Sequence, residues 1–274
     1  MHIHLGVMKT RVPTDAELAV ANSLNKIFSA NIPAGRHIIL AAISAALRGH
    51  KADAEWIKQN VSHLAEDVQE DAYNRYLASE KGAWKLAFSR TFAPMINKTA
   101  SAEAFALAMA DQFFALDKFF LSRTQSRRSR AGTAFEIFMQ DVFIRLGYPF
   151  TPQPKLDGNP DFVLPSIEHY RHNPLDVIVF TVKRSLRERW RQVATEATKG
   201  RGFFLATIDE KTSIGDIQYM QGERIFLVVP ERIKMKFEHY RRAPHVISFE
   251  EFFRDHLDPA MIKWARNGAI KSQT

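Results

Sequence analysis

The chain has 274 residues, of which 46% are hydrophobic, so it is long enough and apolar enough to bury a substantial core. Its 38 lysines and arginines against 30 aspartates and glutamates give a net charge of +8, which favours a negatively charged partner, nucleic acid first. The absence of cysteine excludes disulfides, thiolate metal sites and a cysteine nucleophile, so a metal would sit among oxygens and imidazoles, which suits Mg²⁺. No apolar run has the length of a signal peptide or a membrane span, and a cytoplasmic protein is expected.

The first part of the chain has a helical pattern. From Pro13 to about Leu121, hydrophobic residues recur at spacings of three and four, as in the run from Leu18 to Phe28. Alternation of apolar and polar residues, which would indicate strands, is nearly absent there. The pattern predicts an all-α domain over residues 1–121.

A polar segment, SRTQSRRSRAG, follows at residues 122–132. It has no acidic residue and contains four arginines: Arg123, Arg127, Arg128 and Arg130. Such a cluster indicates contact with phosphates, although a solvated connector is the alternative. Residues 133–147 then have the apolar periodicity of a helix that ends at Gly147.

The remainder of the chain alternates short apolar runs with helical segments. The runs are DFVLP, DVIVFTVK, GFFLATI and RIFLVVP. Short β-branched runs separated by helices are typical of a sheet whose two faces are covered. We therefore predict an α/β (α+β) domain over residues 122–274, with a mixed sheet flanked by helices and preceded by the all-α N-terminal domain.

Two residues at strand ends suggest metal-dependent phosphodiester hydrolysis. Asp161 follows Asn159-Pro160 at the start of one apolar run, and Lys183 ends the next. Hydrolysis of this kind needs a carboxylate to hold Mg²⁺, a lysine to orient water and offset charge, and a second metal-binding carboxylate. Thr181 occupies the strand position where that second carboxylate is usual, but Glu196 on the following helix can supply it.

Each of these residues alone has an ordinary structural explanation. A strand-initial aspartate is often a turn residue, a strand-end lysine is often solvated, and a helical glutamate near arginines is usually a surface ion pair. Their order, their positions on elements of the right kind and the basic charge of the chain together favour a nuclease.

The run Arg187-Glu188-Arg189 is suited to reading base edges at the start of that helix. Arginine can bond guanine bidentately, and glutamate can accept a hydrogen bond from cytosine. For Glu188, a capping box with Ser185 is an equally strong interpretation. For Glu136, a capping box with Thr133 is favoured over metal binding by the residues alone.

Four stretches together resemble one family. SRTQSRRSRAGTAFE, NPDFVLPS, VKRSLRERWRQVATEA and RIFLVVPE, which span about residues 122–255, closely resemble the catalytic domain of the SsoII, PspGI and EcoRII type II restriction endonucleases. These enzymes form a branch of the PD-(D/E)xK nucleases in which the final glutamate has moved from the strand to the following helix. In that branch, threonine at position 181 is expected.

The resemblance implies roles for particular residues. Asp161, Lys183 and Glu196 match the family's catalytic residues, and Glu136 matches a further active-site carboxylate, so Mg²⁺ ligands are implied at Asp161, Glu196 and Glu136. The run Arg187-Glu188-Arg189 matches the residues that read the C:G pairs of a CC/GG core, and Gln125 resembles the family's minor-groove residue. The resemblance therefore favours base reading for Glu188 and an active-site role for Glu136 over helix capping, although each residue could also cap its helix.

The resemblance also implies an activity and its partners. Members bind double-stranded DNA as homodimers and cut CCNGG, CCWGG or an extended TCCNGGA-type site with Mg²⁺, leaving 5′-phosphate ends, in some cases with extrusion of central bases. Residues 1–121 would then clamp DNA and dimerise, no membrane would be involved, and a companion DNA methyltransferase is implied. Two rivals are a non-catalytic sequence-specific DNA-binding protein and a structure-specific repair nuclease of the same fold.

Overall fold

The computed structural model describes residues 13–50, 53–156, 159–186 and 202–271. Its contacts divide the chain into two compact units. The first comprises Met1–Ala34 and Arg75–Ser129, and the second comprises Gly35–Asn74 and Arg130–Thr274. Within the described residues, no helix is long and apolar enough to cross a membrane.

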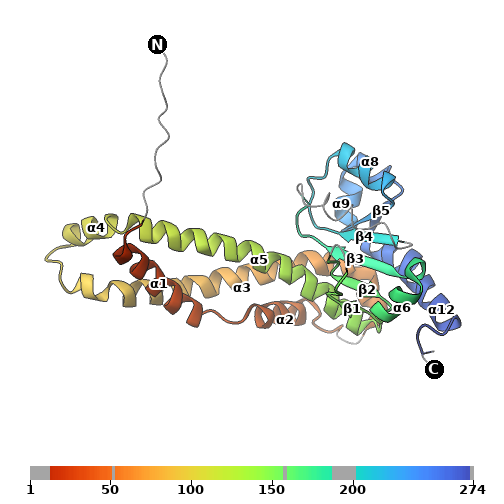
Figure 1. Cartoon of the computed structure of the whole chain (residues 1–274), viewed down its shortest axis with the longest axis horizontal. Helices are drawn as coiled ribbons and strands as arrows, with labels where there is room; N and C mark the ends of the chain where they lie inside the picture. Colours follow the sequence, from red (N-terminus) through yellow and green to blue (C-terminus); the bar gives the residue numbers. More distant parts are fainter. Residues whose placement is uncertain (1–12, 51–52, 157–158, 187–201, 272–274) are drawn as a thin grey trace, which may run out of the picture. The chain divides into compact units, whose positions relative to one another are not determined.

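The first unit is built from helices (Figure 1). It contains α1 (Asp15–Ala30), α4 (Ala102–Ala110) and parts of the long helices α3 (Ala54–Ile96) and α5 (Phe113–Arg145). Thr14 caps α1, because its hydroxyl accepts a hydrogen bond from the Glu17 backbone N–H while the Glu17 carboxylate accepts from the Thr14 N–H. The core of this unit includes buried residues of all three longer helices: Leu24, Phe28, Ala83, Ala87, Phe92 and Phe119.

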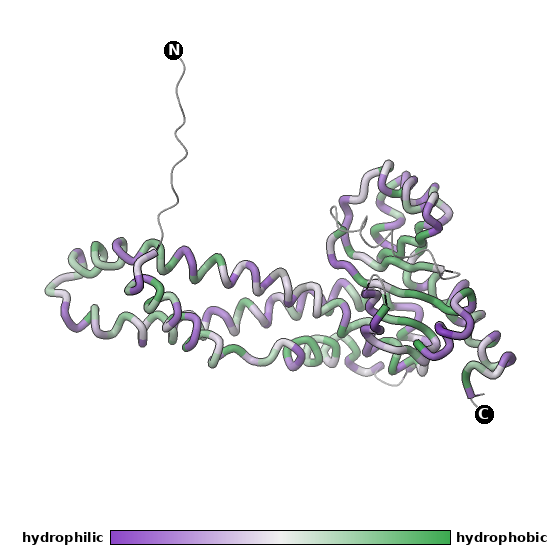
Figure 2. The backbone as a smooth tube through the Cα atoms, viewed as in Figure 1, coloured by the Kyte–Doolittle hydropathy of each residue, from purple (hydrophilic) through white to green (hydrophobic). Residues whose placement is uncertain are grey.

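The second unit is organised around a mixed sheet. In the described part of the chain this sheet has six strands, in the order β1 (Thr151–Pro152), β2 (Phe162–Leu164), β3 (Ile178–Val182), β4 (Gly202–Ala206), β5 (Ile225–Val229) and β6 (Val246–Ser248). The pairs β1–β2 and β2–β3 are antiparallel, and β3 to β6 are parallel. The strands are largely hydrophobic along the backbone tube of Figure 2, as is usual when both faces of a sheet are covered.

Alternate residues of each strand enter two separate cores. On β3, Ile178 and Phe180 belong to one hydrophobic cluster, whereas Val179 belongs to the other. The first face packs against α2 (Gly35–Ala46), the first part of α3, the end of α5 and the C-terminal helices. The second face packs against α8 (Ile214–Gly222), α9 (Glu231–Lys236) and α10 (Glu238–Arg241).

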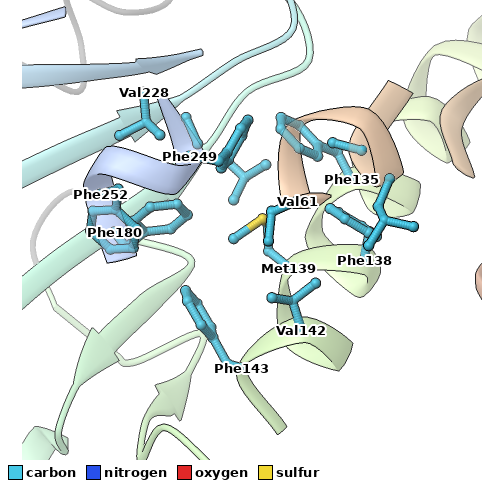
Figure 3. Close-up of a cluster of buried hydrophobic side chains, with 14 of the residues drawn as sticks. Val61, Phe135, Phe138, Met139, Val142, Phe143, Phe180, Val228, Phe249 and Phe252 are labelled. Carbon is cyan, nitrogen blue, oxygen red and sulfur yellow. The ribbon is translucent and has the colours of Figure 1, made fainter. Parts of the chain in front are cut away.

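Aromatic side chains join α5 to the sheet (Figure 3). The ring of Phe143 on α5 lies 5.4 Å from that of Phe162 and 5.5 Å from that of Phe180, both edge to face. Full burial of one such side chain contributes about 1.5–3 kcal/mol to folding, and each favourable ring pair adds about 0.5–1.5 kcal/mol. Helix α5 is therefore held firmly to the strands that precede Lys183.

The remaining elements flank the sheet. They are α6 (Ile167–His172), the 3₁₀ turn Pro174–Asp176, α11 (Phe249–Glu251), a π-helical turn (Phe252–Leu257) and α12 (Asp258–Arg266). Trp264 of α12 is buried, and its indole N–H donates to the Asp176 carbonyl at 2.8 Å.

Much of the predicted order of elements is confirmed. The N-terminal part is helical, and all four apolar runs form strands of a mixed sheet. The polar segment 122–132 is not a connector, because α5 runs through it without interruption. Helix α5 ends at Arg145, and Gly147 follows with φ of 71°, a left-handed conformation that glycine adopts without strain.

The division into units differs from the boundary expected after residue 121. Residues 35–74, which include α2 and the start of α3, pack with the sheet and not with the other N-terminal helices. Helices α3 and α5 each contribute residues to both units, so the chain passes between the units more than once. The crossing after Asn74 lies inside α3, and the crossing after Ser129 lies within the polar segment 122–132 of α5.

Candidate active site

Asp161 lies one residue before β2, where its carboxylate is held from two directions. Its Oδ2 atom accepts hydrogen bonds from the Val182 backbone N–H at 2.7 Å and from Lys183 Nζ at 3.2 Å. Within the described residues, Oδ1 accepts no hydrogen bond, so this oxygen is free to act as a ligand. The carboxylate therefore has a set orientation and an available donor atom.

Lys183 follows β3 directly. Its backbone N–H donates to the Ala206 carbonyl at 2.9 Å, which extends the pairing with β4 by one residue. Its side chain is 33% exposed, and that of Asp161 is 15% exposed, so the ion pair between them reaches the surface. The antiparallel pairing of β2 and β3 brings these two strand-end residues together, as the sequence predicted.

Thr181, two residues before Lys183, is buried, with only 1% of its surface exposed. Its hydroxyl has no hydrogen-bond partner in the described part of the chain. The strand therefore offers no second carboxylate beside Lys183, and a second metal-binding carboxylate would have to come from another element.

Glu136 of α5 is such a carboxylate. Its Oε1 atom accepts a hydrogen bond from Gln153 Nε2 at 2.7 Å. Burial is the largest cause that raises the pKa of Glu136, and the charge of Asp161 raises it further. The hydrogen bond from Gln153 and the charge of Lys183 both lower this pKa. The net direction is upward because burial is the largest of these causes. The capping box with Thr133 is wrong, because Thr133 lies in the interior of α5.

The chemistry of these side chains fits a divalent cation. Two carboxylates in one electrostatic environment disfavour each other's ionised form, and a bound cation would relieve that cost. Carboxylate oxygens are the ligands that hard ions prefer. In the residues that the structure covers, no group of three or more acidic or histidine side chains is arranged to hold a metal ion. Asp161 and Glu136 are linked through Gln153, which donates hydrogen bonds to the Asp161 carbonyl and to the Glu136 carboxylate. The third predicted carboxylate, Glu196, lies outside the described residues.

The predicted base-reading run, Arg187-Glu188-Arg189, also lies outside the described residues, but the structure shows what precedes it. Leu186 is buried, and its backbone N–H donates to Asp209 Oδ2 at 3.0 Å. The other oxygen of Asp209 accepts from the Lys211 N–H at 3.0 Å. Asp209 was not found from the sequence, although a carboxylate just past the end of a parallel strand is a recognisable signal.

The predicted phosphate-contacting arginines differ in their surroundings. Arg123 is 9% exposed; its guanidinium lies over the rings of Phe28 and Phe119 and donates to Asn25 Oδ1 at 2.8 Å. This environment is that of a packing residue of the first unit, because a guanidinium enclosed in this way is not presented to phosphates.

The other members of the arginine cluster lie further along α5. Arg127 donates to the buried Glu80 at 2.6 Å while remaining 48% exposed. Gln125 is exposed and Arg130 is half-buried, and the side chain of Arg128 lies outside the described part.

The sequence model of the family described as EcoRII C terminal matches residues 93–253, which is more than half of the chain and contains Glu136, Asp161 and Lys183. The chain belongs to the EcoRII C-terminal family. This membership confirms the resemblance to the SsoII, PspGI and EcoRII branch.

Two curated members of this branch align with the chain over part of their length. The type II restriction enzyme SsoII of Shigella sonnei is 30% identical over 156 residues, which are 53% of this chain and 50% of that protein. The type II restriction enzyme EcoRII of Escherichia coli is 33% identical over 139 residues, or 48% of this chain and 34% of that protein. The chain thus aligns with half or less of each of these relatives.

Solved structures share the fold of this EcoRII C-terminal family member. Metal-depleted Ecl18kI in complex with uncleaved, modified DNA has a TM-score of 0.78 at 23% identity, covering 96% of this chain and 88% of that one. The PspGI–substrate DNA complex has a TM-score of 0.62 at 21% identity, covering 88% and 97%. The predicted restriction-endonuclease-like core with a helical N-terminal part is therefore confirmed.

Proposed function

We propose that the protein is a type II restriction endonuclease that cleaves both strands of DNA with Mg²⁺. The observation that carries this proposal is the ion pair of Asp161 with Lys183, linked through Gln153 to Glu136, in a member of the EcoRII C-terminal family. The relatives SsoII and EcoRII are named as type II restriction enzymes, and the similar structures of Ecl18kI and PspGI are DNA complexes. The net charge of +8 agrees with a DNA substrate.

Asp161 and Glu136, with Glu196, would hold Mg²⁺. The bound ion would offset the charge of the scissile phosphate and lower the pKa of water. The Val182 N–H and Lys183 orient Asp161 through Oδ2, which leaves Oδ1 available to the ion. Lys183 in turn forms an ion pair with Asp161. Its ammonium group would stand beside the scissile phosphate, orient the attacking water and stabilise negative charge.

Hydrolysis at this site would be an in-line displacement. The water oxygen forms a bond to phosphorus as the bond from phosphorus to the 3′ oxygen breaks, and the leaving oxygen takes up a proton. The products would be a 5′-phosphate and a 3′-hydroxyl.

Sequence recognition is proposed for the segment after Lys183. Arg187, Glu188 and Arg189 would read a CC/GG core in the major groove, within CCNGG, CCWGG or a TCCNGGA-type site, and Gln125 would reach the minor groove. Arg127, Arg128 and Arg130 would contact phosphates. Arg123 is not among the proposed phosphate contacts because it is buried.

A pseudopalindromic site matches a homodimer, in which a twofold axis relates two identical half-sites. Extrusion of central bases and protection by a companion methyltransferase belong to the same proposal.

Incubation with a long DNA of known sequence tests this function. With Mg²⁺ we expect discrete fragments whose ends map to one CC/GG-containing site, and with EDTA we expect none. Lys183→Ala should reduce the rate of cleavage by at least about 100-fold, which is the range in which single electrostatic groups contribute to catalysis. The same variant should still bind the site in Ca²⁺, and Lys271→Ala, at an exposed lysine, should cut like the wild type.

The rival functions give different results in the same assay. Binding without metal-dependent cleavage would identify a non-catalytic DNA-binding protein. A smear of products, or preference for branched DNA, would identify a structure-specific nuclease. Unaltered cleavage by Lys183→Ala would contradict the role assigned to the lysine.

A further inference from the structure

Gln153 has an unusual backbone conformation for its residue type. It follows β1 with φ of 43°, in the left-handed region that a residue with a side chain adopts at a cost. Conformations of this kind persist where surrounding contacts hold them, and they are concentrated at functional sites. The hydrogen bonds of Gln153 therefore indicate which function this backbone conformation serves.

Gln153 contacts both candidate ligand residues. Its backbone N–H donates to the Asp161 carbonyl at 2.8 Å, which continues the pairing of β1 with β2. Its side-chain amide donates to Glu136 Oε1 at 2.7 Å. One residue thus connects the backbone of Asp161 to the carboxylate of Glu136, which comes from a different element.

The chemistry of the amide suits a carboxylate that has to bind a cation. A neutral donor orients the carboxylate but leaves its negative charge in place, whereas a lysine or arginine would offset that charge. Among the described residues, Glu136 accepts a hydrogen bond only at Oε1, so Oε2 stays available.

We propose that Gln153 is a positioning residue, which holds the Glu136 carboxylate in the orientation that receives the metal ion beside Asp161. This inference rests on the proposed function, which makes Glu136 and Asp161 metal ligands. Residues that orient ligands in this way typically contribute 10- to 100-fold to metal affinity or activity.

Two substitutions separate the side chain from the backbone. Gln153→Met removes the amide donor and keeps the length of the side chain. Gln153→Gly also removes the donor, but glycine adopts positive φ freely, so the turn is preserved. Gln218→Met is the matched control, because Gln218 on α8 is exposed and its side chain makes no hydrogen bond to the described residues.

The measurement is Mn²⁺ binding to the full-length protein without DNA, followed by electron paramagnetic resonance. We expect Gln153→Met and Gln153→Gly to weaken Mn²⁺ binding by about 10-fold or more, and Gln218→Met to leave it unchanged. In a Glu136→Gln background, Gln153→Met should have no further effect, because it acts through Glu136. Unfolding temperatures without metal identify any variant that is merely less folded.

The outcomes distinguish this inference from the proposed function. If Asp161→Asn abolishes Mn²⁺ binding but both Gln153 variants bind like the wild type, the positioning role is overturned and the metal site stands. Retention of affinity in Gln153→Gly with loss in Gln153→Met would also overturn it, since the backbone conformation would then be what matters. If Asp161→Asn binds Mn²⁺ like the wild type, or the wild type does not bind it, the proposed metal site fails and the positioning role fails with it.

Discussion

At the scale of single residues, the candidate site depends on a few side chains whose environments differ sharply. Asp161 is oriented by a backbone N–H and by Lys183, whereas Glu136 is half-buried and has an amide as its donor. Burial raises the pKa of Glu136 and the charge of Asp161 adds to this rise, whereas the hydrogen bond from Gln153 and the charge of Lys183 act against it. Thr181 takes no part in this arrangement because it is a buried neutral residue.

His245 should make stability dependent on pH. It is 7% exposed, and its Nε2–H donates to the Ile217 carbonyl at 2.9 Å, while Nδ1 has no partner among the described residues. Burial lowers the pKa of His245, and the hydrogen bond to Ile217 opposes this. The unfolded chain therefore takes up a proton at a higher pH than the folded chain, so stability decreases as pH falls from about 6.5 towards the lowered pKa.

Urea unfolding at pH 7.5 and pH 5.5 tests this expectation. His245→Gln can keep a donor for the Ile217 carbonyl and cannot titrate, so it should lose less stability on acidification than the wild type. Part of the dependence should remain, because burial also lowers the pKa of His256. Equal losses in the wild type and the variant would contradict the assignment.

At the scale of elements, α5 has different roles along its length. Its first part packs in the helical unit, and its last turns pack against the sheet and carry Glu136. The polar stretch 122–132 lies inside this helix, so the backbone positions of its arginines have helical spacing. One of them, Arg123, is used for packing.

Arg123 and Arg130 should therefore respond differently to substitution. Arg123→Ala removes a charge-assisted hydrogen bond to Asn25 and the contacts with Phe28 and Phe119, so we expect a loss of about 1–3 kcal/mol in the free energy of unfolding. Arg130→Ala should instead reduce the slope of log affinity against log salt by about 1, the value for one phosphate contact.

Chemical denaturation and DNA binding at several salt concentrations measure these two effects. If Arg123→Ala reduces the slope of log affinity against log salt without loss of stability, Arg123 contacts a phosphate and is not a packing residue. An unchanged slope of log affinity against log salt in Arg130→Ala would show that Arg130 makes no phosphate contact.

At the scale of the whole molecule, contacts distant in sequence decide which segments belong together. In the second unit, Glu250 accepts hydrogen bonds from the backbone N–H of Ser62 at 2.8 Å and from its hydroxyl at 2.6 Å. The same hydroxyl accepts from the Glu231 N–H at 2.9 Å. Ser62 thus joins α3 to the starts of both α9 and α11, in addition to the hydrophobic packing that groups residues 35–74 with the sheet.

A double-mutant cycle tests this junction. Glu250→Ala leaves two donors of Ser62 without their acceptor, and we expect a loss of about 1–3 kcal/mol in the free energy of unfolding. Ser62→Ala should also destabilise the protein, and the double variant should lose less than the sum of the two, because the residues share their hydrogen bonds. Additive losses would show that the two side chains act separately.

Local pattern was sufficient for part of this protein. Helical periodicity, the four apolar runs and the strand-end positions of Asp161 and Lys183 were predicted because each depends on neighbours within a few residues. Their meeting followed from one antiparallel pairing, of β2 with β3. The two-residue strand β1 was missed because so short an element has no periodicity to detect.

Only the tertiary structure decided the rest. The hydrogen bond of Gln153 to Glu136, the enclosure of Arg123 by Phe28 and Phe119, and the attachment of Ser62 to Glu250 all join residues from separate elements. Helical or strand spacing determines the direction of a side chain on its own element, but its partner depends on which element packs against it. Which elements pack together is determined by the burial of apolar surface over the whole unit, and this cannot be predicted from a short stretch of sequence.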